Sequence, residues 1–205
     1  MFLKKIEPFL QDTLKKTEYL VPTKVEKTCI PKIKSGIDII INAPTGSGKT
    51  SSIVITVIQQ LKKAEADVPR ALIITSSIEE TERIKAQFET LGKNTNLRVF
   101  CESDTKKLED LRDLIYFGSD IVILTAKKVN ELYFYNGINL NGLKMFIVDD
   151  AELVMRDQIL SQINKFAPNL PKCQRIVFCN KFNHQTQHFQ KEFMNFPEIL
   201  DFSKK

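Results

Sequence analysis

The segment that most constrains the fold of this 205-residue chain is residues 43–50, which read Ala-Pro-Thr-Gly-Ser-Gly-Lys-Thr. An apolar run at 37–42 precedes this segment, and a helical pattern at 51–63 follows it. A strand, a glycine-rich loop and a helix in this order form the context of a phosphate-binding loop, because backbone N–H groups and a helix N-terminus then point at the anion. The alternative, a flexible turn with a chance Lys-Thr pair, is disfavoured because the loop and both flanking elements agree.

Each residue of this loop is a candidate for binding the phosphates of a nucleotide. They are Ala43, Pro44, Thr45, Gly46, Ser47, Gly48, Lys49 and Thr50. Lys49 stands where a lysine reaches the β- and γ-phosphates, and the Thr50 hydroxyl stands where it holds Mg²⁺. The strict pattern opens with glycine, whereas this chain has Ala43 there.

The rest of the chain alternates short apolar runs with helical patterns. The expected strands are 37–42, 70–75, 96–101, 120–125, 143–148 and, as the last one, 174–179; the expected helices are 51–63, 78–91, 106–117, 127–133, 158–166 and 186–194. This alternation predicts an α/β fold, with a parallel sheet covered by helices on both faces. We expect one domain over 21–205 and a helical extension over 1–20, with its helix from Pro8 to Tyr19.

Composition supports a soluble folded domain and limits its chemistry. Hydrophobic residues make up 42% of the chain and the net charge is +5, which permits an anionic partner without requiring one. No Cys-x-x-Cys spacing occurs, so reduced buried thiols are favoured over a zinc site. The N-terminus lacks the apolar region of a signal peptide, and no stretch is long enough to span a membrane. We therefore expect a cytoplasmic protein without membrane contact.

Two weaker patterns occur near the C-terminus. The only histidines, His184 and His188, lie four apart in an expected helix, a spacing that can seat a metal, but exposed polar residues are favoured because no third ligand is evident. The phenylalanines of this region are expected to lie in the core: Phe182, Phe189, Phe193 and Phe196.

Polar residues follow several of the expected strands. Because ligands bind beyond the carboxyl ends of parallel strands, we expect the phosphate loop, residues 76–77, residues 125–128 and the pair Asp149-Asp150 to form one site. Beside a phosphate loop, Asp149 is placed to hold Mg²⁺ through water, and Asp150 to orient or deprotonate the attacking water. Taken alone, the acidic pair is better explained as a first helical turn that favours the helix dipole, and only together with the loop is metal binding preferred.

At this point the chain resembles, over nearly its whole length, the N-terminal RecA-like domain of the DEAD-box RNA helicases. Residues 43–50 match the first motif of the family, including its alanine. Asp-Asp-Ala-Glu at 149–152 stands where the family has Asp-Glu-Ala-Asp, and Tyr19 with 22–26 stands where it has an aromatic residue and Pro-Thr-x-Ile-Gln. The resemblance implies a single RecA-like domain of the P-loop NTPase class that binds ATP and Mg²⁺. It also implies that Tyr19 stacks on adenine, that Glu26 takes the adenine-reading position, and that single-stranded RNA binds along Ser77, Thr125, Lys127 and Lys128.

The chain also departs from the family pattern. Glu26 replaces a glutamine, and a carboxylate accepts from the adenine N6 amine but donates to N7 only when protonated. Asp150 is one methylene shorter than the catalytic glutamate, and Cys-Asn-Lys at 179–181 replaces the Ser-Ala-Thr that the family links to coupling. Ile78 replaces an arginine that binds the RNA backbone, and acidic residues at 102–104 occupy the place of a Gly-Gly motif. The phosphate-binding half thus resembles the family more closely than the RNA-reading half does.

Two functions of different class remain open. The first is Mg²⁺-dependent ATP binding with Lys49, Asp149 and Asp150 as catalytic residues, weak hydrolysis and weak RNA binding. Helicases of the family carry a second RecA-like domain with arginine fingers, for which too little chain follows Phe182, so unwinding is not expected of this chain alone. The second function is an interaction module that binds a protein or RNA partner without hydrolysis. A third possibility, a different phosphate-loop enzyme such as a kinase, is disfavoured because residues 19–26 match the DEAD-box pattern.

Overall fold

The computed structural model describes residues 6–17, 21–65, 67–105, 107–155 and 157–203. Its centre is a seven-stranded sheet of order β3-β4-β2-β5-β6-β1-β7, in which every neighbouring pair is parallel. The strands are β1 (Ile39–Asn42), β2 (Ala71–Thr75), β3 (Val99–Cys101), β4 (Ile121–Thr125), β5 (Met145–Val148), β6 (Gln174–Cys179) and β7 (Glu198–Asp201). The α-helices are α1 (Pro8–Lys16), α2 (Lys24–Ile33), α3 (Lys49–Leu61), α4 (Ile78–Leu91), α5 (Leu108–Tyr116), α6 (Ala126–Phe134), α7 (Ala151–Val154), α8 (Asp157–Phe166) and α9 (His184–Phe193).

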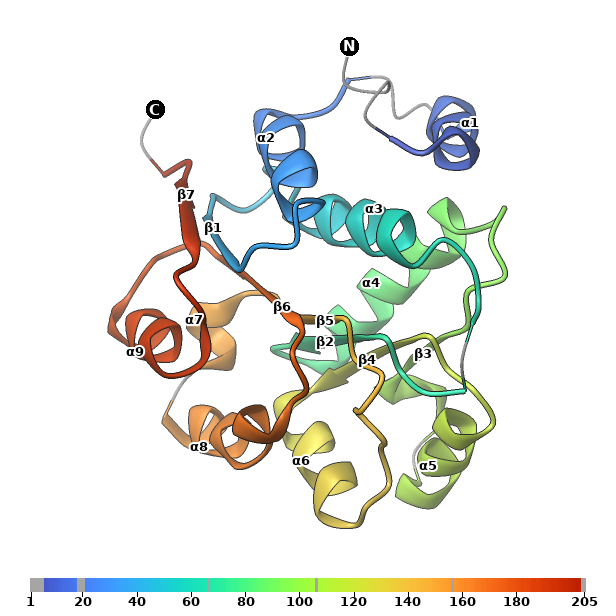
Figure 1. Ribbon diagram of the computed structural model, residues 1–205, viewed down its shortest axis with the longest axis vertical. Helices are drawn as coiled ribbons and strands as arrows, with labels where there is room; N and C mark the ends of the chain where they lie inside the picture. Colours follow the sequence, from blue (N-terminus) through green and yellow to red (C-terminus); the bar gives the residue numbers. More distant parts are fainter. Residues whose placement is uncertain (1–5, 18–20, 66, 106, 156, 204–205) are drawn as a thin grey trace.

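Helices cover both faces of the sheet (Figure 1). Side chains alternate along each strand, so that Ile39 and Ile41 of β1 face one hydrophobic cluster, whereas Ile40 faces the other. Helices α1 to α4 contribute to the first cluster and α5 to α9 to the second. Burial on both faces explains why these strands are continuously apolar.

The strand order determines where a ligand site can form. All neighbouring strands run parallel, so the loops after β1, β2, β4, β5 and β6 emerge at one edge, the carboxyl edge. Strand β1 lies between β6 and β7, and its neighbour in sequence, β2, lies between β4 and β5. The phosphate loop after β1 therefore lies beside the segment after β6, with the acidic segment after β5 one strand further away.

The predicted α/β fold with a parallel sheet is confirmed. The expectation that 174–179 forms the last strand is wrong, because β7 follows and pairs with β1 through Ile39 and Glu198. Helix α2 was not predicted either, since its pattern is interrupted by Pro31 within the helix. Most expected strands begin one to three residues before the observed ones, as for the run 70–75 against Ala71–Thr75.

The ends of the domain differ from expectation in two details. Helix α1 ends at Lys16, and Leu10 and Leu14 of this helix are fully buried in the first cluster. Tyr19 lies outside the described residues, and the division of the chain at residue 20 stays a prediction. The prediction that Phe196 is a core residue is wrong, since 97% of it is exposed, whereas Phe189 is fully buried.

The cysteines and the helices agree with two simpler expectations. All four cysteines are free, and burial raises the pKa of the Cys29 and Cys179 thiols to about 12, which makes them poor nucleophiles. Across the described ranges, no helix is long and apolar enough to cross a membrane.

Candidate functional site

The phosphate loop connects β1 to α3 at the carboxyl edge. Gly46 and Gly48 have φ angles of 77° and 98°, a left-handed region that side chains rarely adopt. Gly48 is the N-cap of α3, and among the described residues no side chain caps the start of this helix, so its first N–H groups remain available to a ligand. These donors and the helix dipole favour an anion at this position.

The segment before α2 braces the loop from one side. Thr23 and Glu26 form a capping box at the start of α2, with Thr23 N donating to Glu26 Oε2 over 2.6 Å. Ser51 Oγ of α3 donates to Glu26 Oε1, so the buried carboxylate joins α2 to α3. A Cβ on Gly48 would lie 2.7 Å from Thr23 Oγ1 and 2.8 Å from Glu26 Oε1, so this packing excludes a side chain.

Glu26 thus has a structural role that its motif position did not reveal. Both its oxygens accept hydrogen bonds from Thr23 and Ser51, and it is 2% exposed. Burial raises the pKa of its carboxyl group. Its role in reading adenine stays a prediction.

Lys49 is held at the centre of the site. It begins α3, is 7% exposed, and its Nζ donates to the carbonyl of Ala43 over 3.1 Å and to Oδ1 of Asn180. The same Nζ lies 3.9 Å from Asp150 Oδ1. Uncharged oxygens therefore hold the ammonium close to the loop, where an anion would exchange with them.

The acidic pair follows β5 directly. Asp149 is 3% exposed, and its Oδ1 accepts from Asp150 N over 3.0 Å. Burial, and next the negative charge of Asp150, raise the pKa of Asp149 to about 7. Asp150 has a left-handed backbone with φ 47°, and burial raises the pKa of its carboxyl as well, while Lys49 acts in the opposite direction. The structure thus keeps two carboxylates close together beside one buried lysine.

Asn180 links the two halves of this site, and the sequence analysis missed it. It follows β6, and its Oδ1 accepts from Lys49 Nζ and, over 3.3 Å, from Thr45 Oγ1. Its Nδ2 donates to Glu152 Oε1 over 2.6 Å and to Asp150 Oδ1 over 3.4 Å.

The contact between Asn180 and Glu152 explains two departures at once. The backbone N of Asn180 also donates to Glu152 Oε2 over 3.0 Å, so two hydrogen bonds join Asn180 to Glu152 alone. The acidic segment and the segment after β6 are therefore in contact despite the departures at 179–181 and 152, and the loss of coupling between hydrolysis and unwinding stays a prediction. Glu152 is longer than the aspartate of the family motif, and Asn180 replaces its alanine, so the two side chains form a matched pair. The simultaneous departure at both positions was the sequence signal that could have predicted this contact.

The residues expected to hold Mg²⁺ fit a partly hydrated ion. Asp149 is a buried carboxylate, and no ion pair within the described segments neutralises it. Those segments also contain no cluster of three or more His, Cys, Asp or Glu side chains suited to a metal, so His184 and His188 do not form such a site. Mg²⁺ commonly binds through one or two protein oxygens together with phosphates and water, which matches Asp149 and the Thr50 hydroxyl.

The residues expected to contact RNA follow β2 and β4 at the same edge, but they already have partners. Ser77 caps α4 and accepts from Glu80 N over 3.4 Å. Thr125 donates from its N–H and its hydroxyl to Glu102 Oε2 over 2.9 and 2.7 Å, and its Oγ1 accepts from Lys128 N.

The two lysines of this strip share one acid. Lys128 Nζ donates to Glu131 Oε2 over 2.8 Å, and Lys127 Nζ lies 4.0 Å from Glu131 Oε1 with 76% of its side chain exposed. We call Ser77, Thr125, Lys127 and Lys128 the outer strip. Its polar groups stabilise helix starts and local pairs, and Lys127 is the most open of its cations.

Comparison with known proteins agrees with this geometry. The DEAD/DEAH box helicase profile matches residues 23–187, which include the loop, the acidic segment and Asn180. The chain belongs to the DEAD/DEAH box helicase family. It is 28% identical over 172 residues to the ATP-dependent rRNA helicase RRP3 of Lodderomyces elongisporus, covering 83% of this chain and 34% of that protein. It is 27% identical over 199 residues to the putative DEAD-box ATP-dependent RNA helicase 29 of Arabidopsis thaliana, covering 94% of this chain and 23% of that protein.

Solved structures show the same RecA-like fold. The DEAD box protein of the hyperthermophile Methanococcus jannaschii superimposes with a TM-score of 0.88 at 21% identity, covering 96% of this chain and 54% of that one. The yeast DEAD-box splicing factor Prp28 gives a TM-score of 0.85 at 19% identity, covering 96% and 50%. The chain thus spans about a quarter to a third of the length of these two curated relatives and about half of each solved chain.

Proposed function

We propose that this domain binds ATP together with Mg²⁺ at the carboxyl edge, hydrolyses it slowly and binds single-stranded RNA weakly. The observation that carries the proposal is the position of Lys49, buried between the phosphate loop and Asp150 and held by neutral oxygens. Membership of the DEAD/DEAH box helicase family supports ATP as the nucleotide. Base recognition by Tyr19 and Glu26 is part of the proposal, although the engaged oxygens of Glu26 favour weak discrimination between ATP and GTP.

Binding of the phosphates follows from the loop. The N–H groups of residues 46–50 and the ammonium of Lys49 donate to phosphate oxygens, and Lys49 exchanges Asn180 Oδ1 for one of them. Thr50 and Asp149 would hold Mg²⁺, which neutralises charge on the β- and γ-phosphates when bound. The raised pKa of Asp149 fits this role, because an uncompensated buried carboxylate gains most from a nearby cation.

Asp150 is the proposed base that orients the attacking water. Burial raises the pKa of Asp150, and a general base is most effective when its pKa lies near the working pH. Its carboxylate lies near both Lys49 and Asn180, with 3.9 Å to Lys49 Nζ and 3.4 Å to Asn180 Nδ2. An aspartate reaches less far than a glutamate, so we expect slow hydrolysis, which Asp150→Asn abolishes.

RNA binding is assigned to the outer strip because of its position beside the nucleotide site, and it is expected to be weak because its lysines are already paired. Lys127 and Lys128 supply positive charge beside the nucleotide site, but Glu131 offsets part of it. Because the chain spans only part of the helicases that it resembles, duplex unwinding is proposed only for this domain joined to a second RecA-like domain, which also supplies further RNA contacts.

The test is a titration of the protein with a fluorescent ATP analogue, with and without Mg²⁺. We expect saturable, Mg²⁺-dependent binding that falls at least about a hundredfold in Lys49→Ala, since a charge-assisted phosphate contact is lost. Lys63→Ala, at an exposed lysine just after α3, is the matched control and should bind as the wild type does. Absence of binding in the wild type would contradict the proposal and favour an interaction module that works without nucleotide.

A further inference from the structure

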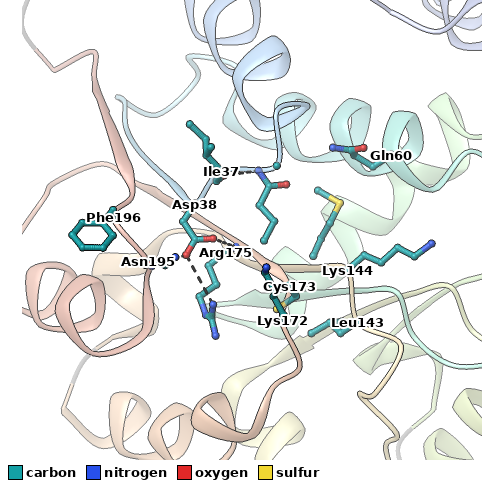
Figure 2. A pocket seen from close by; sticks show the side chains of 13 residues that line it. Ile37, Asp38, Gln60, Leu143, Lys144, Lys172, Cys173, Arg175, Asn195 and Phe196 are labelled. Carbon is teal, nitrogen blue, oxygen red and sulfur yellow. Dashed lines mark hydrogen bonds and ion pairs between the residues drawn. The ribbon is translucent and has the colours of Figure 1, made fainter.

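A cavity of about 740 Å³ lies at the amino edge of the sheet, opposite the phosphate loop. It opens where β1, β5 and β6 begin, and its walls also include the residues that follow α9. Figure 2 shows Asp38 and Arg175 near its centre, with Phe196 on one side and Lys144 on the other. Nothing in the nucleotide site uses these residues.

The guanidinium group of Arg175 is poorly satisfied for a group so enclosed. Only 20% of its side chain is exposed, and within the described residues its Nε is buried without a hydrogen-bond partner. Its charged neighbour is Asp38, whose Oδ2 lies 4.0 Å from Arg175 Nη1, beyond ordinary hydrogen-bond length. Such a group retains the planar set of donors that binds carboxylates in pairs.

Asp38 is satisfied by the backbone and does not use these donors. Its Oδ1 accepts from Arg175 N over 2.7 Å and its Oδ2 from Asn195 N over 2.8 Å. Two more cations line the cavity. Lys144 pairs with Glu65 over 3.3 Å, with both side chains more than half exposed, and Lys172 has no ion pair within the described part of the chain. Because Glu65 offsets Lys144, Arg175 and Lys172 face one committed carboxylate, Asp38, and the cavity stays positive.

The cavity also has an apolar wall that stays exposed among the residues that the structure describes. Phe196 is 97% exposed and has a left-handed backbone with φ 44°, and Ile37 is 43% exposed. A phenylalanine held both exposed and in a sparsely populated conformation commonly marks a contact site. Apolar and cationic groups therefore meet in a single recess.

We propose that this cavity docks an acidic segment of a partner protein, in which an aromatic or aliphatic side chain packs against Phe196 and Ile37 while neighbouring carboxylates bind Arg175 and Lys172. Charge complementarity favours this occupant. A nucleic acid is a poorer match, because its evenly spaced phosphates cannot avoid the Asp38 carboxylate, whereas a peptide can carry its carboxylates only opposite Arg175 and Lys172. Since the cavity lies at the other edge of the sheet, docking does not compete with ATP.

The experiment uses a labelled panel of short acidic peptides, each with one aromatic or leucine residue flanked by aspartates and glutamates, in fluorescence polarisation. We expect binding that weakens about tenfold or more in Arg175→Gln and in Lys172→Glu. Peptides with amides in place of the carboxylates should bind as weakly as these variants do. Lys107→Glu, an equal charge change at an exposed site before α5, is the matched control and should bind as the wild type does.

Two further measurements separate docking from folding and from the nucleotide site. Phe196→Ala removes an exposed ring, so it should leave the thermal unfolding midpoint unchanged and still weaken peptide binding. Saturating Mg²⁺-ATP should leave the peptide affinity unchanged. The proposal is overturned if no peptide of the panel binds, or if Arg175→Gln and Lys172→Glu bind the peptides as tightly as the wild type does. It is also overturned if these variants lose affinity for a single-stranded oligonucleotide rather than for any peptide.

Discussion

The nucleotide site and the outer strip share the carboxyl edge but differ in how their polar groups are satisfied. At the nucleotide site, Lys49 donates to neutral oxygens and its nearest carboxylate, Asp150, is 3.9 Å away. Asp149 lies buried without an ion pair in the described structure, so both residues gain from a ligand of opposite charge. In the outer strip, Thr125 and Lys128 already have carboxylate partners. A ligand at the outer strip must displace these internal contacts. A nucleotide at the phosphate loop would instead supply the opposite charges that Lys49 and Asp149 lack. This difference supports the proposal that the phosphate loop binds its ligand more tightly than the outer strip binds RNA.

The largest effect is expected from a substitution of Gly48 in the phosphate loop. Replacement by alanine strains the left-handed backbone and places a Cβ against Thr23 and Glu26. We therefore expect Gly48→Ala to lower the free energy of unfolding by about 3 kcal/mol and to abolish ATP binding. Gly46→Ala is the matched control, because its φ of 77° is strained but nothing lies within 4 Å of its Cβ. Its cost should be about 1 kcal/mol. Urea unfolding measures both, and equal losses would show that the brace on the loop is unimportant.

The buried acid gives the second prediction, which concerns pH. Folding raises the pKa of Asp149 from 3.8 to about 7, so the folded state holds a proton that the unfolded state releases. The contribution of this group to stability is therefore fully present below about pH 4 and is lost as the pH rises through 7. Without nucleotide, Asp149→Asn should be about 2 kcal/mol more stable than the wild type at pH 8 and nearly equal to it at pH 4. Denaturant unfolding across this range tests it, and a pH-independent difference would contradict it.

The link through Asn180 gives a smaller effect. Asn180→Ala removes the side-chain donor to Glu152 and one acceptor of Lys49, so stability should fall by about 1 kcal/mol. Affinity for Mg²⁺-ATP should change less than about tenfold, because phosphate replaces Asn180 at Lys49 in the bound state. Lys181→Ala, at the exposed neighbouring residue, is the control for both measurements. A fall in ATP affinity as large as that of Lys49→Ala would instead place Asn180 among the ligands of the nucleotide.

The smallest effect concerns the outer strip. Glu131→Gln removes the carboxylate shared by Lys127 and Lys128, so affinity for single-stranded RNA should rise about two- to fourfold at low salt. Glu109→Gln, on the exposed first turn of α5, is the matched control for the change in net charge. An equal rise in both variants would mean that only net charge matters and that the strip is not the RNA surface.

Sequence patterns were sufficient to predict the sheet, its parallel strands and the loop, because buried strands are apolar throughout and glycines mark the phosphate loop. They missed β7, whose alternating burial is only partial at the sheet edge, and α2, which contains Pro31. The phosphate loop, residues 76–77, residues 125–128 and the acidic pair were expected at one edge of the sheet and lie there. Asn180, in contrast, was interpreted only as a departure from the family motif. Its role depends on the longer reach of Glu152, and such a compensation becomes visible only when both side chains are placed in space.

The most direct test of the central claim is calorimetric titration of a single preparation, first with Mg²⁺-ATP and then with a single-stranded RNA oligonucleotide. The account predicts saturable nucleotide binding, with an RNA affinity at least about tenfold weaker, since the nucleotide site has uncompensated groups and the outer strip does not. RNA that binds more tightly than Mg²⁺-ATP, or nucleotide binding that does not saturate, would contradict the account.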